Sequence, residues 1–280
     1  MHSYVVLDVF TEVPLEGNQL AVFADGAGLS REDMQRAARE MNLSETVFLL
    51  PGDNGADARV RIFTPTAELP FAGHPVLGTA FVVGDRLGKR IVRLQTGAGV
   101  IPIELTRDRD RIVFGEMEQP IPTTERFERG TELLNALGVE RSQLPIEAYR
   151  NGPVHVYVAL ASEAGVASLR PDMAALAAIA DSLGVSCFAG AGAHIKTRMF
   201  APSLGVDEDP ATGSAAGPLA VHLARHRQIA FGERIEIRQG AEISRPSVLY
   251  ARVEGTAGKI ERVVVGGSAV LVARGEYRLA

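Results

Sequence analysis

Hydrophobic and polar residues alternate along much of the chain with a period of two, which predicts strands that bury one face. This pattern is typical of antiparallel sheet. There are too many such segments for a helical bundle. The predicted strands cover residues 5–10, 20–23, 45–50, 59–63, 91–95, 100–105, 111–116, 154–160, 196–200, 234–238, 248–253 and 260–265.

Helical spacing of apolar residues appears in fewer places. The clearest helix follows Ser30, whose side chain can cap the N–H of Asp33, and it ends near Asn42. A second helix opens at His74 and Pro75, where a proline costs no hydrogen bond. The remaining helices are predicted over residues 131–137, 173–183 and 215–225.

The order of elements restarts midway along the chain. Residues 61–65 and 198–202 share the pattern Arg-x-Phe-x-Pro, and each leads into a glycine-containing loop and a helix. The segments 43–45 and 185–187 also look equivalent, because each follows a predicted helix. We therefore predict an α+β fold of two pseudo-duplicated lobes with a ligand cleft between them.

The two prolines of residues 119–122 interrupt the regular pattern and mark the crossing between the lobes. The N-terminal lobe is predicted to cover residues 1–118, completed by a C-terminal strand at 266–280. Residues 119–265 are then the C-terminal lobe.

Composition narrows the class of partner. The chain has 280 residues, 46% of them hydrophobic, and a net charge of −5, which argues against nucleic acid and against an anionic membrane surface. No apolar segment is long enough to span a membrane, and the N-terminus does not read as a secretory signal. Cys187 is the single cysteine, which favours a reducing, cytoplasmic setting. We expect a small-molecule substrate.

Two loops have the chemistry of an anion site. Gly73 with His74, and Gly213 with Ser214, lie where a strand turns into a helix. Backbone N–H groups at a helix start, together with the helix dipole, attract a carboxylate or a developing oxyanion. The alternative is that each glycine only permits a tight turn.

Three features that could carry chemistry accompany these loops: Glu45, His74 and an acidic cluster. Glu45 begins an apolar strand that would partly desolvate it, and burial lets a carboxyl act as both acid and base. At a helix start the charged form of His74 is disfavoured, so a neutral imidazole is expected. Asp207 and Asp209 belong to an acidic cluster that could hold a metal or an ammonium group. The alternatives are an exposed strand-edge Glu45, an ordinary helix-start histidine and a solvated acidic turn.

Other motifs point away from metal or cofactor chemistry. His222 and His226 lie one helical turn apart, but the glutamate of the zinc-protease helix is absent, so a solvated helix face is predicted. There is no phosphate-binding loop, nucleophile elbow or dinucleotide fingerprint.

Four segments together resemble the PhzF family of phenazine biosynthesis: Glu-Gly-Asn at 16–18, Met-Asn-Leu-Ser-Glu-Thr at 41–46, Leu-Pro-Phe-Ala-Gly-His-Pro at 69–75 and Glu-Asp-Pro-Ala-Thr-Gly-Ser-Ala-Ala-Gly at 208–217. The likeness runs essentially end to end. Segments 145–152 and 223–229 look most like the members that act in phenazine synthesis itself.

The resemblance implies a diaminopimelate-epimerase-like fold, in which each lobe wraps a largely antiparallel sheet around a central helix, and a homodimer. It implies isomerisation of dihydrohydroxyanthranilate without metal or organic cofactor. Glu45 would move a proton from C3 to C1 of the ring, with His74 and Asp209 beside it. The related racemases carry a cysteine before each loop glycine, where this chain has Ala72 and Thr212.

The resemblance also implies which residues bind the substrate. Those that would hold the carboxylate and neighbouring groups are Gly73, His74, Gly213 and Ser214, and those that would orient the ring, hydroxyl and amine are Asn18, Ser44 and Asp209. Two other functions stay open: an isomerase or epimerase of another amino or hydroxy acid, and a non-catalytic carboxylate-binding protein.

Overall fold

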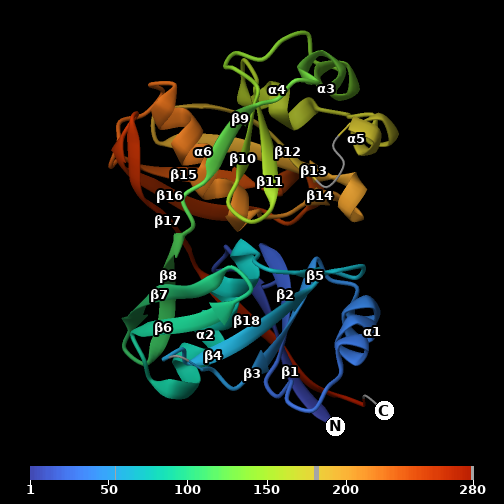
Figure 1. Ribbon diagram of the computed structural model, residues 1–280, viewed down its shortest axis with the longest axis vertical. Coiled ribbons are helices and arrows are strands. Elements are labelled where there is room, and N and C mark those ends of the chain that lie inside the picture. The colour runs from blue at the N-terminus through green and yellow to red at the C-terminus, as the bar shows by residue number, and fades with distance from the viewer. Residues whose placement is uncertain (54, 180–182, 279–280) are drawn as a thin grey trace. The chain divides into compact units, whose positions relative to one another are not determined.

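The computed structural model describes residues 1–53, 55–179 and 183–278. The chain divides into two compact units (Figure 1). Unit 1 consists of Met1–Glu118 with Gly266–Ala280, and unit 2 of Gln119–Val265.

Unit 1 is one curved sheet with two helices. Its strands run in the order β18-β1-β2-β3-β4-β6-β7-β8, and β5 adds to the end of β4. All neighbours are antiparallel except β2 with β3 and β4 with β6. The elements are β1 (His2–Val9), β2 (Asn18–Phe23), α1 (Arg31–Met41), β3 (Glu45–Leu50), β4 (Ala58–Phe63), β5 (Glu68–Leu69), α2 (Gly73–Leu87), β6 (Ile91–Thr96), β7 (Gly99–Asp108), β8 (Arg111–Gln119) and β18 (Ala269–Tyr277).

Unit 2 repeats this plan. Its strands run in the order β9-β10-β11-β12-β13-β15-β16, β14 adds to β13, and the parallel pairs are β11 with β12 and β13 with β15. The predicted duplication is confirmed by this shared order. The elements are β9 (Thr123–Arg126), α3 (Gly130–Leu137), β10 (Glu147–Arg150), β11 (Val154–Ala159), α4 (Glu163–Ser168), α5 (Met173–Ile179), β12 (Leu183–Ala191), β13 (His194–Ala201), η1 (Pro202–Leu204), β14 (Val206–Asp209), α6 (Gly213–Arg225), β15 (Arg234–Gln239), η2 (Ala241–Ile243), β16 (Ser247–Thr256) and β17 (Lys259–Gly267).

The shared arginine of the repeated motif makes the same ion pair in both units. Arg61 binds Glu68 of β5 through two hydrogen bonds of 2.7 and 2.8 Å. Arg198 binds Glu208 of β14 in the same way, at 2.9 and 2.7 Å. In each unit the fork-shaped guanidinium fastens a short strand to the sheet just before the glycine loop.

A central helix fills the concave side of each sheet. The helices α2 and α6 are buried along nearly their whole length, and most of their residues are apolar or small on every side, as in a helix enclosed by sheet. Further helices pack on the outer faces: α1 in unit 1, and α3, α4 and α5 in unit 2 (Figure 1). Strand β11 is therefore buried on both faces and is apolar at almost every position. The predicted α+β class is confirmed.

Two details of the predicted elements are wrong. The helix expected over residues 173–183 ends at Ile179, and Leu183 begins strand β12; residues 180–182 lie outside the described residues. The elements that were not predicted are mostly of six residues or fewer, too short to show a period: β5, β9, β10, β14 and α4.

Candidate active site

The two central helices differ from the surface helices at their N-termini. Ser30 and Ser162 cap α1 and α4 with their side chains. The cap residues of α2 and α6, Ala72 and Thr212, make no such hydrogen bond. Thr212 instead donates its hydroxyl to Asp209 at 2.6 Å. Both central helices thus present a start that no cap side chain covers, which is the arrangement that suits an anionic ligand.

Side chains of unit 2 hold the first turn of α6 in place. Pro218 lacks an N–H group, which leaves the carbonyl of Ser214 without its helical partner. The Asn151 side chain donates to this carbonyl at 2.9 Å. Gln119 donates to the carbonyl of Gly213 at 2.8 Å. The helix start is therefore fixed by hydrogen bonds made to its own backbone.

Glu45 and His74 are in contact in unit 1. Glu45 is the first residue of β3, and its side chain is 15% exposed. Its Oε2 lies 3.5 Å from Nδ1 of His74, the second residue of α2, which is 4% exposed at the side chain. Burial lowers the pKa of His74 to about 3, although its hydrogen bond to the Gln19 backbone opposes this. The neutral imidazole expected at this position is therefore the form present at neutral pH.

The hydrogen-bond partners of His74 determine its tautomer. Nε2 lies 3.3 Å from the carbonyl oxygen of Gln19, which can only accept, so Nε2 carries the hydrogen. Nδ1 is then a bare acceptor directed at Glu45. This contact is a hydrogen bond when the carboxyl of Glu45 holds a proton. The pair is thus arranged to handle a single mobile proton, which is what an acid/base group requires.

Ser214 has an imidazole partner in unit 2. Nε2 of His155, on strand β11, lies 3.0 Å from the Ser214 hydroxyl, and both side chains are buried. Burial lowers the pKa of His155 to about 4, so it too is neutral at pH 7. Within the described part of the chain its Nδ1 has no hydrogen-bond partner. The Ser214 hydroxyl is therefore held in one place by a buried neutral base.

Strand registers identify equivalent positions of the two units. Thr46 pairs with Phe63 across β3 and β4, and Val185 pairs with Phe200 across β12 and β13. The two phenylalanines belong to the repeated motif, so position 184 corresponds to position 45. The predicted equivalence of 43–45 with 185–187 is wrong by three residues, because order along the chain does not fix which residues pair.

The equivalent positions carry different chemistry. Unit 2 has Gly184 where unit 1 has Glu45. A Cβ at position 184 would lie 2.7 Å from Nδ1 of His155, so the imidazole fills the space that a side chain there would need. One unit thus offers Glu45 against His74, and the other offers His155 against Ser214. Duplication of the fold has left a carboxyl group at this position in unit 1 alone.

The three acidic residues of segment 207–209 lie in three different environments. Asp207 is exposed, and Glu208 is engaged by Arg198. Asp209 is buried beside the start of α6, where it accepts the Thr212 hydroxyl. The backbone carbonyl of Asp209 accepts the Gln239 side chain at 2.7 Å. Asp209 is therefore the acid that lies at a helix start.

The remaining candidates lie beside these groups. Asn18 begins β2 and is fully buried, next to Gln19, which His74 contacts. Ser44 is half-buried and directly precedes Glu45. Unit 1 therefore brings together five of the candidate residues, Asn18, Ser44, Glu45, Gly73 and His74. Unit 2 brings together the other three, Asp209, Gly213 and Ser214.

The sequence reasoning missed residues that support the site, chiefly Gln119, Asn151 and His155. A signal for one of them existed: His155 is a polar residue inside an otherwise apolar strand. Asn151 and Gln119 had none, because each acts on a carbonyl more than sixty residues away in the chain.

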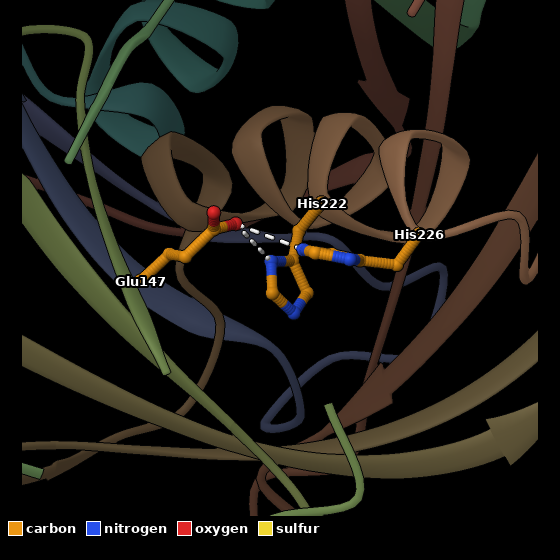
Figure 2. Close-up of side chains that lie close together, drawn as sticks. All are labelled: Glu147, His222 and His226. Carbon is orange, nitrogen blue, oxygen red and sulfur yellow. Dashed lines mark hydrogen bonds and ion pairs between the residues drawn. The ribbon is translucent and has the colours of Figure 1, made fainter. Parts of the chain in front are cut away.

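The predicted solvated face at His222 and His226 is wrong. His222 is fully buried, and Glu147 of β10 approaches both imidazoles (Figure 2). Among the described residues these three are the one group of His, Cys, Asp and Glu spaced for a metal ion. His222 lies nine residues beyond Gly213, roughly 13 Å along α6, so this group is separate from the helix start.

Lowering the pH from 7.5 to 5 is expected to destabilise the protein. The unfolded chain protonates its histidines below about pH 6.5, whereas folded His74 and His155 stay neutral down to a pKa of about 3 and about 4. The stability present above pH 6.5 is therefore lost as the pH falls, by about 2 kcal/mol for each histidine at pH 5. Urea unfolding at the two pH values measures this loss. Equal midpoints would contradict it, and His194→Gln, at an exposed site, should leave the loss unchanged.

No helix among the described residues has both the length and the apolar character needed to cross a bilayer.

Comparison with known proteins identifies the family of the chain. A curated relative from Pseudomonas aeruginosa, named trans-2,3-dihydro-3-hydroxyanthranilate isomerase, is 55% identical over 279 residues, covering 100% of both chains. The crystal structure of a Bacillus anthracis phenazine biosynthesis protein of the PhzF family superposes with a TM-score of 0.86, at 26% identity over 99% of both chains. A probable proline racemase from Agrobacterium radiobacter shares the fold, with a TM-score of 0.73 and 13% identity over 100% of this chain and 94% of the other. The PhzC-PhzF model, described as phenazine biosynthesis-like protein, matches residues 7–275, and the chain belongs to this family.

Proposed function

We propose that this protein is a cofactor-independent isomerase of trans-2,3-dihydro-3-hydroxyanthranilate in phenazine biosynthesis. One observation carries the mechanism: a mostly buried carboxyl, Glu45, lies against the acceptor nitrogen of a neutral imidazole, His74, at the start of a buried helix. The full-length likeness to an isomerase with that name supports the choice of substrate.

In the proposed reaction Glu45 first takes the proton from C3 of the ring, which breaks the C3–H bond. The electron pair moves along the conjugated double bonds, and the carboxyl returns a proton at C1. The product is an enol at C3 that becomes an amino ketone. No atoms or electrons are gained or lost, so the reaction needs no oxidant and no organic cofactor.

The other candidate residues receive roles that fit their positions. Backbone N–H groups at Gly73 and Gly213, together with the Ser214 hydroxyl, bind the carboxylate and the groups beside it. Asp209 binds the amine. Asn18 and Ser44 orient the ring and its hydroxyl.

Three effects supply the rate in this mechanism. Positioned acid/base catalysis contributes about 10²- to 10⁴-fold. Holding the C3–H bond parallel to the π-system, beside the carboxyl, adds the advantage of a preformed geometry. Burial of Glu45 and His74 keeps bulk water from competing for the proton.

Incubating the purified protein with the substrate tests the function. We expect the ultraviolet spectrum to change as the conjugated diene rearranges, and mass spectrometry to show a product of unchanged mass. Absence of conversion, with ligand binding retained, would instead support a non-catalytic carboxylate-binding protein. Racemisation of free amino acids would support an epimerase. We also propose a homodimer, which a light-scattering mass equal to the 29.9 kDa of one chain would exclude.

A further inference from the structure

The sequence segments 145–152 and 223–229 come together in unit 2. The first contributes Glu147 and Tyr149 of β10, and the second contributes Arg225 and His226 at the end of α6. His222 completes the group one helical turn earlier. Figure 2 shows a single carboxylate oxygen of Glu147 directed at both imidazoles. The proposed catalytic mechanism uses none of these side chains.

The distances match those of a small metal site. Oε2 of Glu147 lies 2.9 Å from Nε2 of His226 and 3.3 Å from Nδ1 of His222. The three ligand atoms all lie within 4.8 Å of one another. A tetrahedral zinc ion bound at about 2.0–2.1 Å keeps its ligand atoms roughly 3.4 Å apart. Small side-chain movements would therefore admit an ion.

The surrounding rings fix the orientation of His222. Its imidazole stacks on Tyr157, with ring centres 5.6 Å apart and an angle of 21° between the planes. Tyr149 and Phe188 meet it edge-on, at 5.6 and 5.8 Å. His226 is partly exposed, which leaves a route for an ion from solvent. The ligands are thus held before any ion arrives.

We propose that Glu147, His222 and His226 form a binding site for a divalent transition-metal ion, with Zn²⁺ the best match. Two imidazoles and one carboxylate, with a fourth position open to water, are typical of zinc rather than of magnesium or calcium, which take oxygen ligands. A bound ion joins β10 to the end of α6. It would stiffen the helix whose start carries Gly213 and Ser214, without entering the reaction.

Arg225 competes with the ion. Its Nη1 lies 3.2 Å from the Tyr149 hydroxyl and 3.8 Å from Oε2 of Glu147, and its side chain is one-third exposed. Metal binding requires the guanidinium to turn toward solvent, because two cations would otherwise share one carboxylate. Arg225→Ala should therefore bind the ion more tightly than the wild-type protein does.

Calorimetric titration of ZnCl₂ into untagged, chelator-treated full-length protein tests the site. We expect one ion per chain with a Kd of about 10 µM or lower, and a rise in melting temperature. Co²⁺ should give the visible absorption bands of a tetrahedral nitrogen and oxygen site. Absence of saturable binding up to about 100 µM Zn²⁺ would overturn the proposal and leave a metal-free hydrogen-bond cluster.

Variants locate the ion. Glu147→Gln and His226→Gln should each weaken binding at least about tenfold, and Arg225→Ala should strengthen it. His194→Gln, which alters an exposed histidine beside Glu236, should change nothing. Equal affinity in all four variants would overturn the assignment. If circular dichroism shows that His226→Gln does not fold, the zinc affinities of Glu147→Gln and Arg225→Ala, which should change in opposite directions, still test the assignment of the site.

Discussion

Glu45→Gln is expected to lower kcat by about 10²- to 10⁴-fold while KM changes little. The amide has nearly the shape of the carboxyl, so the substrate still binds. It cannot take the C3 proton, and its NH₂ group or its oxygen, rather than an acid proton, faces Nδ1 of His74. Steady-state rates with the ring substrate and an inert substrate analogue measure kcat, KM and binding separately.

A matched control for this variant is Glu104→Gln, which changes an exposed glutamate of β7 in the same unit. Its kcat should equal that of the wild-type protein. The role given to Glu45 fails if Glu45→Gln keeps the wild-type rate. It also fails if KM rises while kcat is retained, since Glu45 would then bind substrate without transferring a proton.

Arg198→Ala is expected to lower the free energy of unfolding by about 3–5 kcal/mol, because it leaves a buried carboxylate without its partner. The Arg198 and Glu208 side chains are only 7% and 8% exposed. The guanidinium also donates to the carbonyl of Leu169 at 2.8 Å and lies over the Phe200 ring. Urea unfolding followed by circular dichroism measures the loss.

The duplication supplies the control for this variant. Arg61 makes the same pair with Glu68, but there the side chains are 19% and 24% exposed, and Arg31 also binds Glu68. Arg61→Ala should therefore cost clearly less than Arg198→Ala. Equal losses of unfolding free energy in the two variants would show that burial of the ion pair does not determine how much its removal destabilises the protein. The double change Arg198→Met with Glu208→Leu should recover much of the stability, because an apolar pair leaves no unpaired charge.

The parts of the fold that depend on nearby residues could be predicted. Ser30 caps α1 through the N–H of Asp33, and Asn42 ends the helix in the left-handed region, so the sequence predicted both ends correctly. The repeated Arg-x-Phe-x-Pro motif predicted the duplication for a similar reason. Each copy directs one arginine to a glutamate seven or ten residues further on.

Features that depend on which residues pair between strands could not be predicted from the local sequence. The equivalence of Gly184 with Glu45 follows from which residue faces Phe200 and which faces Phe63. A shift of register changes that partner without changing the local pattern. The loss of the acid in unit 2 was therefore visible only in the structure.

The side chains that surround the candidate residues could not be predicted, because they lie far from those residues along the chain. His155 reaches Ser214 across 59 residues, and Glu147 reaches His222 across 75. A helical spacing of two histidines gives no information on a carboxylate that another strand brings to them. Burial of His222 likewise followed from α6 being enclosed on all sides, which its small residues allowed but did not dictate.

The most direct test of proton transfer by Glu45 follows a deuterium atom placed at C3 of the substrate. Nuclear magnetic resonance and mass spectrometry of the product show whether the label has left C3 and whether any has arrived at C1. The account predicts that the wild-type protein removes the label from C3, whereas Glu45→Gln leaves it there over the same time. Movement of the label in Glu45→Gln at the wild-type rate would contradict the account, since the hydrogen would then cross the ring without this carboxyl.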